Sequence, residues 1–323
     1  MATELEIPVT WMRYDVTMPL IDGRVTIDGV RLVPSRSAPN GTIIGPDSPI
    51  LRGDFGLVDL NMGNWLPGVE AGWEIAPLPV FPKRKHVYTY LFCRADAGIE
   101  TPKDLEGKRV LSTIGGSAVA IWLKALLAQR HGVDLTRVTW VTGREQWPQH
   151  RPDWTVEQLP GRKSVVEALL DGDADATMLD VSDRQLWQTL ETHPKIKRLF
   201  PDYLGEARRY FEESGIYTPV HMLVLSRKLD RDYPELADKL CAAFEQAKRV
   251  AMDDVLDDRA GFSLIDLRER TLAQEAAWGD LFPYGITANK PAIDAFAAHC
   301  HAHGIVERIH PYAEIFAART LDT

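Results

Sequence analysis

Two long strand-like runs constrain the fold of this 323-residue chain more than any other feature. The runs are H-V-Y-T-Y-L-F-C at 86–93 and S-G-I-Y-T-P-V-H-M-L-V-L-S at 214–226, and their β-branched and aromatic residues favour strands. Elsewhere strand-like and helix-like segments alternate, which is typical of an α/β protein with mixed or parallel sheets. We therefore predict two lobes with a cleft between them, one formed by 1–90 plus 217–323 and the other by the inserted 91–216.

Composition and charge exclude several classes of function. The net charge of −9 argues against a nucleic-acid-binding protein, whose footprint is a basic patch. No apolar stretch approaches the roughly 18 residues that a membrane span requires. The N-terminus M-A-T-E-L-E-I-P-V-T-W is acidic and has no long apolar run, so we expect a cytoplasmic protein without a secretory signal. Three widely spaced cysteines (Cys93, Cys241 and Cys300) are typical of small buried side chains in a reducing compartment.

Cationic and titratable residues precede the first strand-like run, in P-V-F-P-K-R-K-H at 79–86. Arg84, Lys85 and His86 lie at the mouth of this expected strand, where they can meet a small anionic ligand. Side chains two residues apart in a strand share a face, so we expect Tyr88 beside His86. We predict that this strand crosses between the lobes and lines the cleft.

Other polar residues are expected where strands end, which is where open α/β sheets bind ligands. Asn61 and Asn64 follow a short strand, although they are also suited simply to forming the turn there. Ser117 follows Gly115 and Gly116 at the start of a helix, where free N–H groups favour an anion. Asp180 ends a buried strand. No P-loop pattern is present, so a carboxylate is favoured over a nucleotide.

The remaining periodicity predicts helices and one irregular segment. Apolar residues within 118–126 repeat at helical spacing and indicate a helix with one buried face. We expect a long amphipathic helix over 236–251 and another helix over 291–303 that stops at Gly304. The segment 144–162 has no clean period and is expected to be irregular.

Six motifs along nearly the whole chain resemble the 4,5-dihydroxyphthalate decarboxylase family. They are Y-D-V-T at 14–17, P-V-F-P-K-R at 79–84, T-P-K-D-L-E-G-K-R-V at 101–110, L-F-P-D-Y at 199–203, S-G-I-Y-T-P-V-H at 214–221 and F-P-Y-G-I-T-A-N at 282–289. The resemblance implies a type II periplasmic-binding-protein-like fold. It also implies decarboxylation of a hydroxylated aromatic acid, with neither a metal nor an organic cofactor.

The chain departs from the family pattern at two places. Val87 and Tyr88 stand where the family has an Arg-His pair, and Leu179-Asp180-Val181 replaces its Gly-Pro-Arg. The exact substrate and the retention of catalysis therefore stay open. His299, Cys300, His301 and His303 look metal-like, but they fall at the end of a helix, where cationic side chains favour the carbonyl end.

The resemblance and the residues together suggest roles for individual side chains. We predict His221 as the general acid or base and Arg84 as the carboxylate clamp, with His86 and Tyr88 as weaker catalytic candidates. The predicted substrate-binding residues are Tyr14, Asp15, Asn61, Asn64, Ser117, Asp180, Tyr284 and Asn289.

Two alternatives stay open beside the decarboxylase. One is a related lyase or dehydratase on the same fold, resembling the chorismate dehydratase of the futalosine pathway. The other is a non-catalytic cytoplasmic binding protein for an aromatic or dicarboxylic acid, because a fold does not fix a function. In each case the expected partner is a small anionic aromatic ligand, and the protein is a candidate homo-oligomer.

Overall fold

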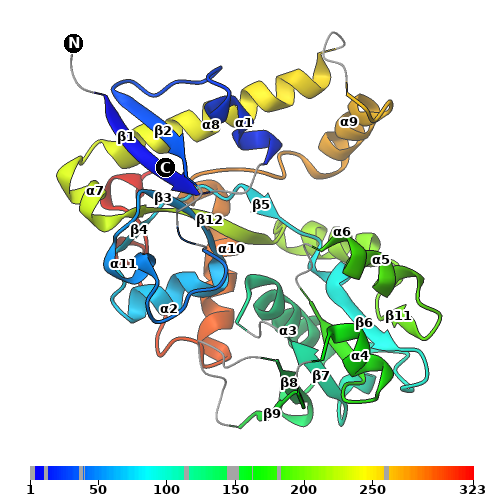
Figure 1. The fold of residues 1–323 in the computed structure, drawn as a ribbon. Helices are drawn as coiled ribbons and strands as arrows, with labels where there is room; N and C mark the ends of the chain where they lie inside the picture. The colour runs from blue at the N-terminus through cyan, green and yellow to red at the C-terminus, as the bar shows by residue number, and fades with distance from the viewer. Residues whose placement is uncertain are drawn as a thin grey trace. The chain divides into compact units, whose positions relative to one another are not determined.

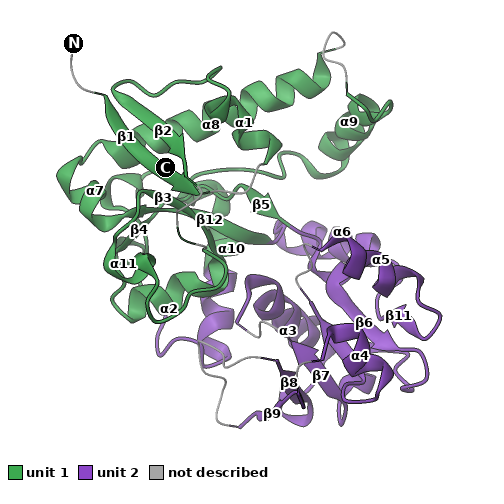
Figure 2. Ribbon diagram, viewed as in Figure 1, with its two compact units in different colours: residues 1–84, 219–293, 310–323 green, residues 85–218, 294–309 purple. Residues whose placement is uncertain are grey.

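The chain forms two compact units, each built on one mixed sheet (Figures 1 and 2). The computed structural model describes residues 4–10, 14–35, 39, 41–112, 116–143, 153–161, 163–179, 183–257 and 262–323. Unit 1 contains residues 1–84, 219–293 and 310–323, and unit 2 contains residues 85–218 and 294–309. The segment 294–309, which the predicted lobes place with the first lobe, packs within unit 2.

The sheet of unit 1 has the strand order β2-β1-β3-β12-β4, and β5 also pairs with β12. The strands are β1 (Leu5–Thr10), β2 (Val30–Pro34), β3 (Leu57–Asn61), β4 (Ile75–Pro77), β5 (Lys83–Arg84) and β12 (Pro219–Ser226). β1 is parallel to both β2 and β3, whereas β12 is antiparallel to β3, β4 and β5. Every residue of β12 is buried, which agrees with its central place and its apolar sequence.

Helix α8 (Leu236–Leu256) covers one face of this sheet, as its amphipathic pattern predicts. Its side chains Leu240 and Phe244 belong to the same core as Leu57 and Leu223 of the sheet. The other helices that begin in unit 1 are α1 (Met18–Ile21), α2 (Trp65–Glu70), α7 (Arg227–Asp232), α9 (Leu267–Trp278), α10 (Ile286–Ala302) and α11 (Tyr312–Ile315).

The sheet of unit 2 has the strand order β11-β6-β10-β7-β8-β9. Its strands are β6 (Leu91–Arg94), β7 (Arg109–Ser112), β8 (Thr139–Thr142), β9 (Thr155–Gln158), β10 (Ala176–Met178) and β11 (Ile196–Arg198). Four strands are parallel, and β6 runs antiparallel to β10 and β11. The accompanying helices are α3 (Ala118–His131), α4 (Val165–Leu170), α5 (Arg184–Thr192) and α6 (Tyr203–Ser214).

The predicted strand at 86–93 is wrong in its first half. Val87–Tyr90 forms a 3-10 helix, η4, and only β6, which begins at Leu91, is a strand. η4 packs against α3 and α6, so tertiary packing overrides the strand propensity of Val, Tyr and Thr here. With three residues per turn, residues two apart do not share a face, so the argument that paired His86 with Tyr88 fails.

Four other predictions of secondary structure need correction. α6 extends through Ser214, so the second run becomes a strand only at Pro219. α10 begins at Ile286 and contains Pro291, which we expected to start the helix. β9 lies within the segment expected to be irregular; its side chains are exposed, so backbone pairing with β8 alone defines it. α3 is buried on all sides from Ala118 to Leu127, because its apolar residues occupy every face.

No helix in the described part of the chain is both long enough and apolar enough to cross a membrane.

Candidate functional site

The carboxyl ends of β1 and β3 position three polar side chains of unit 1. These two strands are parallel, so both end at the same edge of the sheet, and the antiparallel β12 begins at that edge. Tyr14 lies a few residues beyond β1 and caps the short 3-10 helix η1 (Asp15–Thr17), which packs against α8. Asp59 lies in β3, and His221 lies near the start of β12.

Asp59 joins Tyr14 and His221 in one hydrogen-bonded chain. The Tyr14 hydroxyl donates to Asp59 Oδ2 at 2.8 Å, and His221 Nδ1 lies 3.0 Å from Asp59 Oδ1. The register explains this geometry: β12 pairs His221 with Asn61, and Asp59 is two residues from Asn61 on the same face. Both ionisable side chains are withdrawn from water, since Asp59 is 6% exposed and His221 is 1% exposed.

Sequence reasoning missed Asp59. A signal for it exists in G-L-V-D-L-N, where a carboxylate interrupts a five-residue strand whose residues are all buried. A buried carboxylate needs hydrogen-bond donors, and that requirement points to a partner such as Tyr14 or His221.

Asn61 and Asn64 stabilise the backbone next to the hydrogen-bonded residues Tyr14, Asp59 and His221. Asn61 Oδ1 accepts from the N–H of Gly63 at 3.0 Å, and so caps the short helix that follows β3. Asn64 Nδ2 donates to the carbonyl oxygens of Gly41 and Thr42 at 3.1 and 3.2 Å. These contacts agree with the turn-forming role that the sequence left open for both residues.

Arg84 is anchored by the loop that contains P-Y-G. Its Nη2 donates to the carbonyl oxygen of Pro283 at 3.0 Å and also to Asn289 Oδ1. Asn289 in turn donates to the carbonyl oxygens of Pro283 and Gly285 at 2.8 and 2.7 Å. The Gly285 N–H donates to the Pro79 carbonyl at 2.8 Å. Two of the sequence motifs, at 79–84 and 282–289, therefore meet in unit 1.

A β-bulge lies in the pairing of β12 with β5, beside Arg84. β12 pairs Pro219 with Arg84 and His221 with Lys83, so the register shifts by one residue between these two pairs. The bulge lies on β12, where one extra residue, Val220, stands between the residues opposite Arg84 and Lys83.

Tyr284 interacts with charged side chains of this region, among them Arg84 and Lys248. Its hydroxyl is buried and has no hydrogen-bond partner within the described ranges. Burial raises the pKa of the Tyr284 phenol well above its usual value, while the charge of Arg84 opposes this shift and that of Asp15 adds to it. Lys248 Nζ lies 4.9 Å from the centre of the ring. A phenol placed in this way can donate to an anion or to a substrate hydroxyl.

Two of the predicted catalytic residues, His86 and Tyr88, belong to unit 2. The His86 ring packs 4.8 Å from Tyr217, and burial lowers the pKa of His86. The Tyr88 ring packs 4.8 Å from Phe200, and burial raises the pKa of Tyr88 while Arg130 opposes the shift. His86 and Tyr88 border a cavity of about 10 Å³, which is room for roughly one water molecule.

The remaining predictions concern the anion site at α3 and the end of β10. Ser117 is the N-cap of α3, and its Oγ accepts from the Ala120 N–H at 3.3 Å. Its hydroxyl is thus used in capping the helix. Gly115 and Asp180 lie outside the described residues.

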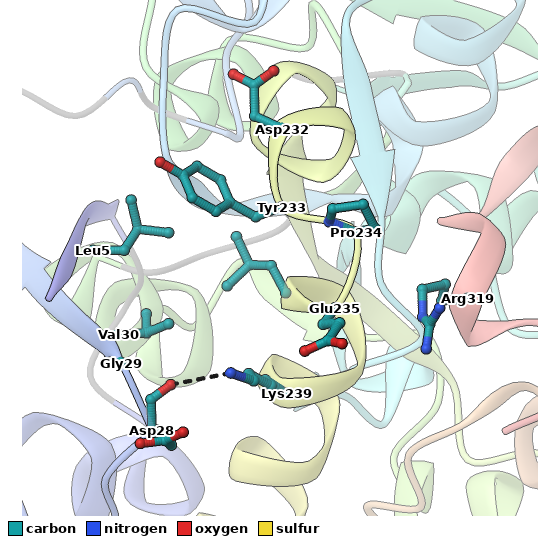
Figure 3. A pocket seen from close by; sticks show the side chains of 11 residues that line it. Leu5, Asp28, Gly29, Val30, Asp232, Tyr233, Pro234, Glu235, Lys239 and Arg319 are labelled. Atoms are coloured by element: carbon teal, nitrogen blue, oxygen red, sulfur yellow. Dashed lines mark hydrogen bonds between the residues drawn. The ribbon is translucent and has the colours of Figure 1, made fainter. Parts of the chain in front are cut away.

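A separate pocket of about 530 Å³ lies at the opposite edge of the unit 1 sheet (Figure 3). Leu5 and Val30, which begin β1 and β2, line it together with Tyr233 and Lys239. Lys239 Nζ donates to the Asp28 carbonyl at 3.3 Å. Because ligands of open α/β sheets bind at the carboxyl ends of strands, this amino-terminal edge is the less favoured site.

The metal-like histidines are mostly packed against aromatic side chains. The His299 ring lies 5.3 Å from Trp122, and the His303 ring lies 5.4 Å from Trp154. Among the residues that the structure describes, no three His, Cys, Asp or Glu side chains are grouped to hold a metal ion.

Comparison with known proteins agrees with the motifs. A protein named 4,5-dihydroxyphthalate decarboxylase from Comamonas testosteroni is 28% identical to this chain, and the alignment covers 99% of both. A protein of the same name from Pseudomonas putida is also 28% identical, over 64% of this chain and 82% of its own length. The resemblance of this chain to that family, as a divergent sequence, is therefore confirmed.

Family and structure comparisons agree on the fold. Residues 84–147 match a family described as NMT1/THI5 like. The periplasmic sulfonate-binding protein of Methylobacillus flagellatus has a TM-score of 0.57 at 13% identity, covering 100% of this chain and 94% of that one. The aliphatic sulphonate binding protein of Escherichia coli has a TM-score of 0.52 at 13% identity, covering 98% and 92%. The predicted α/β fold of the type II periplasmic-binding-protein kind is confirmed.

Proposed function

We propose that this protein is a cofactor-independent decarboxylase of a hydroxylated aromatic carboxylic acid similar to 4,5-dihydroxyphthalate. The observation that carries the proposal is the hydrogen-bonded series from Tyr14 to the buried Asp59 and His221 at the carboxyl edge of the unit 1 sheet. The full-length similarity to proteins named for this reaction supports the choice of substrate class.

The reaction needs a proton donor at one ring carbon. A proton is added to the carbon that bears the carboxylate, and a para hydroxyl oxygen supplies electron density to the ring. The carbon–carbon bond then breaks and carbon dioxide leaves. The electron pair of that bond restores the aromatic ring, so no redox partner or electron-accepting cofactor is required.

His221 is the proposed proton donor. An imidazole can give up a proton to the ring carbon and regain one afterwards. Asp59 Oδ1 accepts a hydrogen bond from the Nδ1–H of His221, and its negative charge stabilises the protonated ring. The apolar strand around His221 keeps bulk water away from the transferred proton.

Arg84 and Tyr284 are the proposed partners of the substrate's acidic groups. The guanidinium of Arg84 lies in a fixed position, because the loop at Pro283 and the Asn289 side chain hold it. Its charge favours the spectator carboxylate, and the buried Tyr284 hydroxyl is available to a ring hydroxyl or a carboxylate oxygen. Positioned charges of this kind stabilise the transition state without reorganisation.

A substrate panel tests this function. The purified protein is incubated with hydroxybenzoates and with phthalates that carry or lack ring hydroxyls, with and without a chelator. We expect carbon dioxide release from a para-hydroxylated acid that persists with the chelator. Release that stops with the chelator would contradict the cofactor-independent reaction, and no release from any member would contradict the decarboxylase itself.

A second function, binding without catalysis, is favoured by the likeness of the fold to sulfonate-binding proteins. The same panel separates the two. A ligand that raises the melting temperature and is recovered unchanged supports a binding protein. A free ligand at about 100 times its Kd stabilises a protein by about 2.7 kcal/mol, which a thermal shift readily detects.

A further inference from the structure

Both carboxylate oxygens of Asp59 have hydrogen-bond partners: one is Tyr14 and the other is the proposed catalytic residue His221. Tyr14 donates to Oδ2 at 2.8 Å, and His221 Nδ1 lies 3.0 Å from Oδ1. An ionised carboxylate can only accept hydrogen bonds, so Nδ1 of His221 must carry a hydrogen. The neutral ring is then the Nδ1–H tautomer, and Nε2 is the nitrogen left for chemistry.

The elements that bring these three groups together are rigid. β3 and β12 pair over five residues, from His221 with Asn61 to Leu225 with Leu57. Tyr14 is fixed by η1, where the N–H and the hydroxyl of Thr17 both donate to the Tyr14 carbonyl oxygen, at 3.1 and 3.0 Å. Asp59 is also buried within a strand, where an ionised side chain persists only with such partners.

We infer that Asp59 is a positioning residue for His221, which orients the ring and fixes its tautomer so that Nε2 handles the proton of decarboxylation, and that Tyr14 orients Asp59. This role rests on the proposed function. It assigns to Asp59 and Tyr14 an action through His221 and no contact with the substrate.

Replacement of Asp59 by Asn tests the inference, because the side chain keeps its size. The Tyr14 hydroxyl can still donate to the amide oxygen, which leaves the amide N–H₂ facing Nδ1. Nδ1 must then accept, and the hydrogen moves to Nε2, the wrong tautomer for the reaction. We expect kcat to fall by on the order of 100-fold or more while KM changes little. Asp54→Asn, an exposed carboxylate change nearby, is the matched control.

Two further measurements keep the test decisive. Two-bond ¹H–¹⁵N NMR spectra report the tautomer of His221 directly, and we expect Nδ1–H in the natural protein and Nε2–H in D59N. Tyr14→Phe removes only the hydroxyl, so we expect a loss in kcat of about tenfold with the Nδ1–H tautomer retained. Y14F also tests the hydrogen-bonded series from Tyr14 through Asp59 to His221 if D59N does not fold.

The possible failures are distinguishable. An Nε2–H tautomer in the natural protein, or a kcat for D59N within about threefold of the natural value, would overturn the positioning role. An unchanged kcat in Y14F would show that Tyr14 has no part in positioning His221. If the natural protein releases no carbon dioxide from any acid, the proposed function fails, and the NMR spectra alone then decide whether Asp59 fixes the histidine.

Discussion

His221 and His299 are both buried, but their surroundings give them different chemistry. His221 lies beside the carboxylate of Asp59, whereas His299 Nδ1 lies 3.4 Å from the Gln129 amide and the ring contacts Trp122. Burial lowers the pKa of His299 to about 4 from its usual 6.5. A histidine whose pKa is lower in the folded protein than in the unfolded chain lowers the free energy of unfolding in acid.

We predict that His299 makes the fold sensitive to acid between pH 6.5 and 4. In this range the unfolded chain binds a proton at this ring and the folded chain does not, so the free energy of unfolding falls as the pH falls. At about pH 5 the loss is on the order of 2 kcal/mol. Urea titrations near pH 7.5 and near pH 5 should show a smaller difference in the free energy of unfolding for His299→Gln than for the natural protein. The exposed change His301→Gln should keep the natural difference, and an equal loss in both variants would contradict the assignment.

Arg84 should not tolerate replacement by lysine. Its guanidinium donates to both the Pro283 carbonyl and the Asn289 side chain through one nitrogen. A lysine ammonium lacks the planar fork and cannot keep this arrangement. We expect kcat/KM of R84K to fall by about 10- to 100-fold, mainly through KM. Arg52→Lys, at an exposed position, is the control; R84K with natural kinetics would contradict a role for the guanidinium.

At the residue scale, the sequence identifies groups that stand out by type or motif. It identified His221, Arg84, Tyr14 and Asn289, and the structure gives each of these a polar contact in unit 1. Asp59 escaped because a single carboxylate within an apolar strand resembles the polar end of that strand. The contact of Asp59 with His221 depends on the register between β3 and β12, and this register is a property of the folded sheet.

At the scale of elements, β3 depends on the close approach of the backbone at Gly41. The N–H of Asn61 donates to the Gly41 carbonyl at 3.0 Å, and a Cβ on Gly41 would lie 2.1 Å from the carbonyl oxygen of Asp59. This contact is with backbone, so β3 or the segment at Gly41 would have to move.

We therefore predict that Gly41→Ala destabilises the fold and displaces Asp59. We expect a loss of about 1–3 kcal/mol in the free energy of unfolding, measured by urea titration, together with reduced turnover. Gly45→Ala is the matched control, because a Cβ there meets no atom within 4 Å. Equal stability of the two variants would contradict the close approach.

The secondary structure of residues 79–90 was predicted only in part. The sequence singled out P-V-F-P-K-R, but Val87 to Tyr90 adopt a 3-10 helix despite their strand propensity. The competing factor is the burial of Val87 and Tyr88 against α3 and α6, which are distant in the sequence. Local propensity contains no information on such contacts.

At the scale of the whole molecule, alternation of strands and helices predicted the α/β class and the two sheets, because these depend on pattern and not on single contacts. The residues of the proposed site in unit 1 come from distant segments: Tyr14, Asp59, Arg84, His221 and Asn289. A two-part fold of this kind is shared with sulfonate-binding proteins, so the fold alone does not select the reaction.

The most direct test follows the carboxyl carbon. 4,5-Dihydroxyphthalate labelled with ¹³C in its carboxyl groups is given to the natural protein, to His221→Gln and to the exposed control His301→Gln, and labelled carbon dioxide is measured against 3,4-dihydroxybenzoate. We predict equal amounts of the two products from the natural protein and from H301Q, and a rate lower by on the order of 100-fold or more for H221Q. Natural turnover by H221Q would contradict the assignment of His221 as the proton donor, and labelled substrate recovered intact from the natural protein would contradict decarboxylation of this acid.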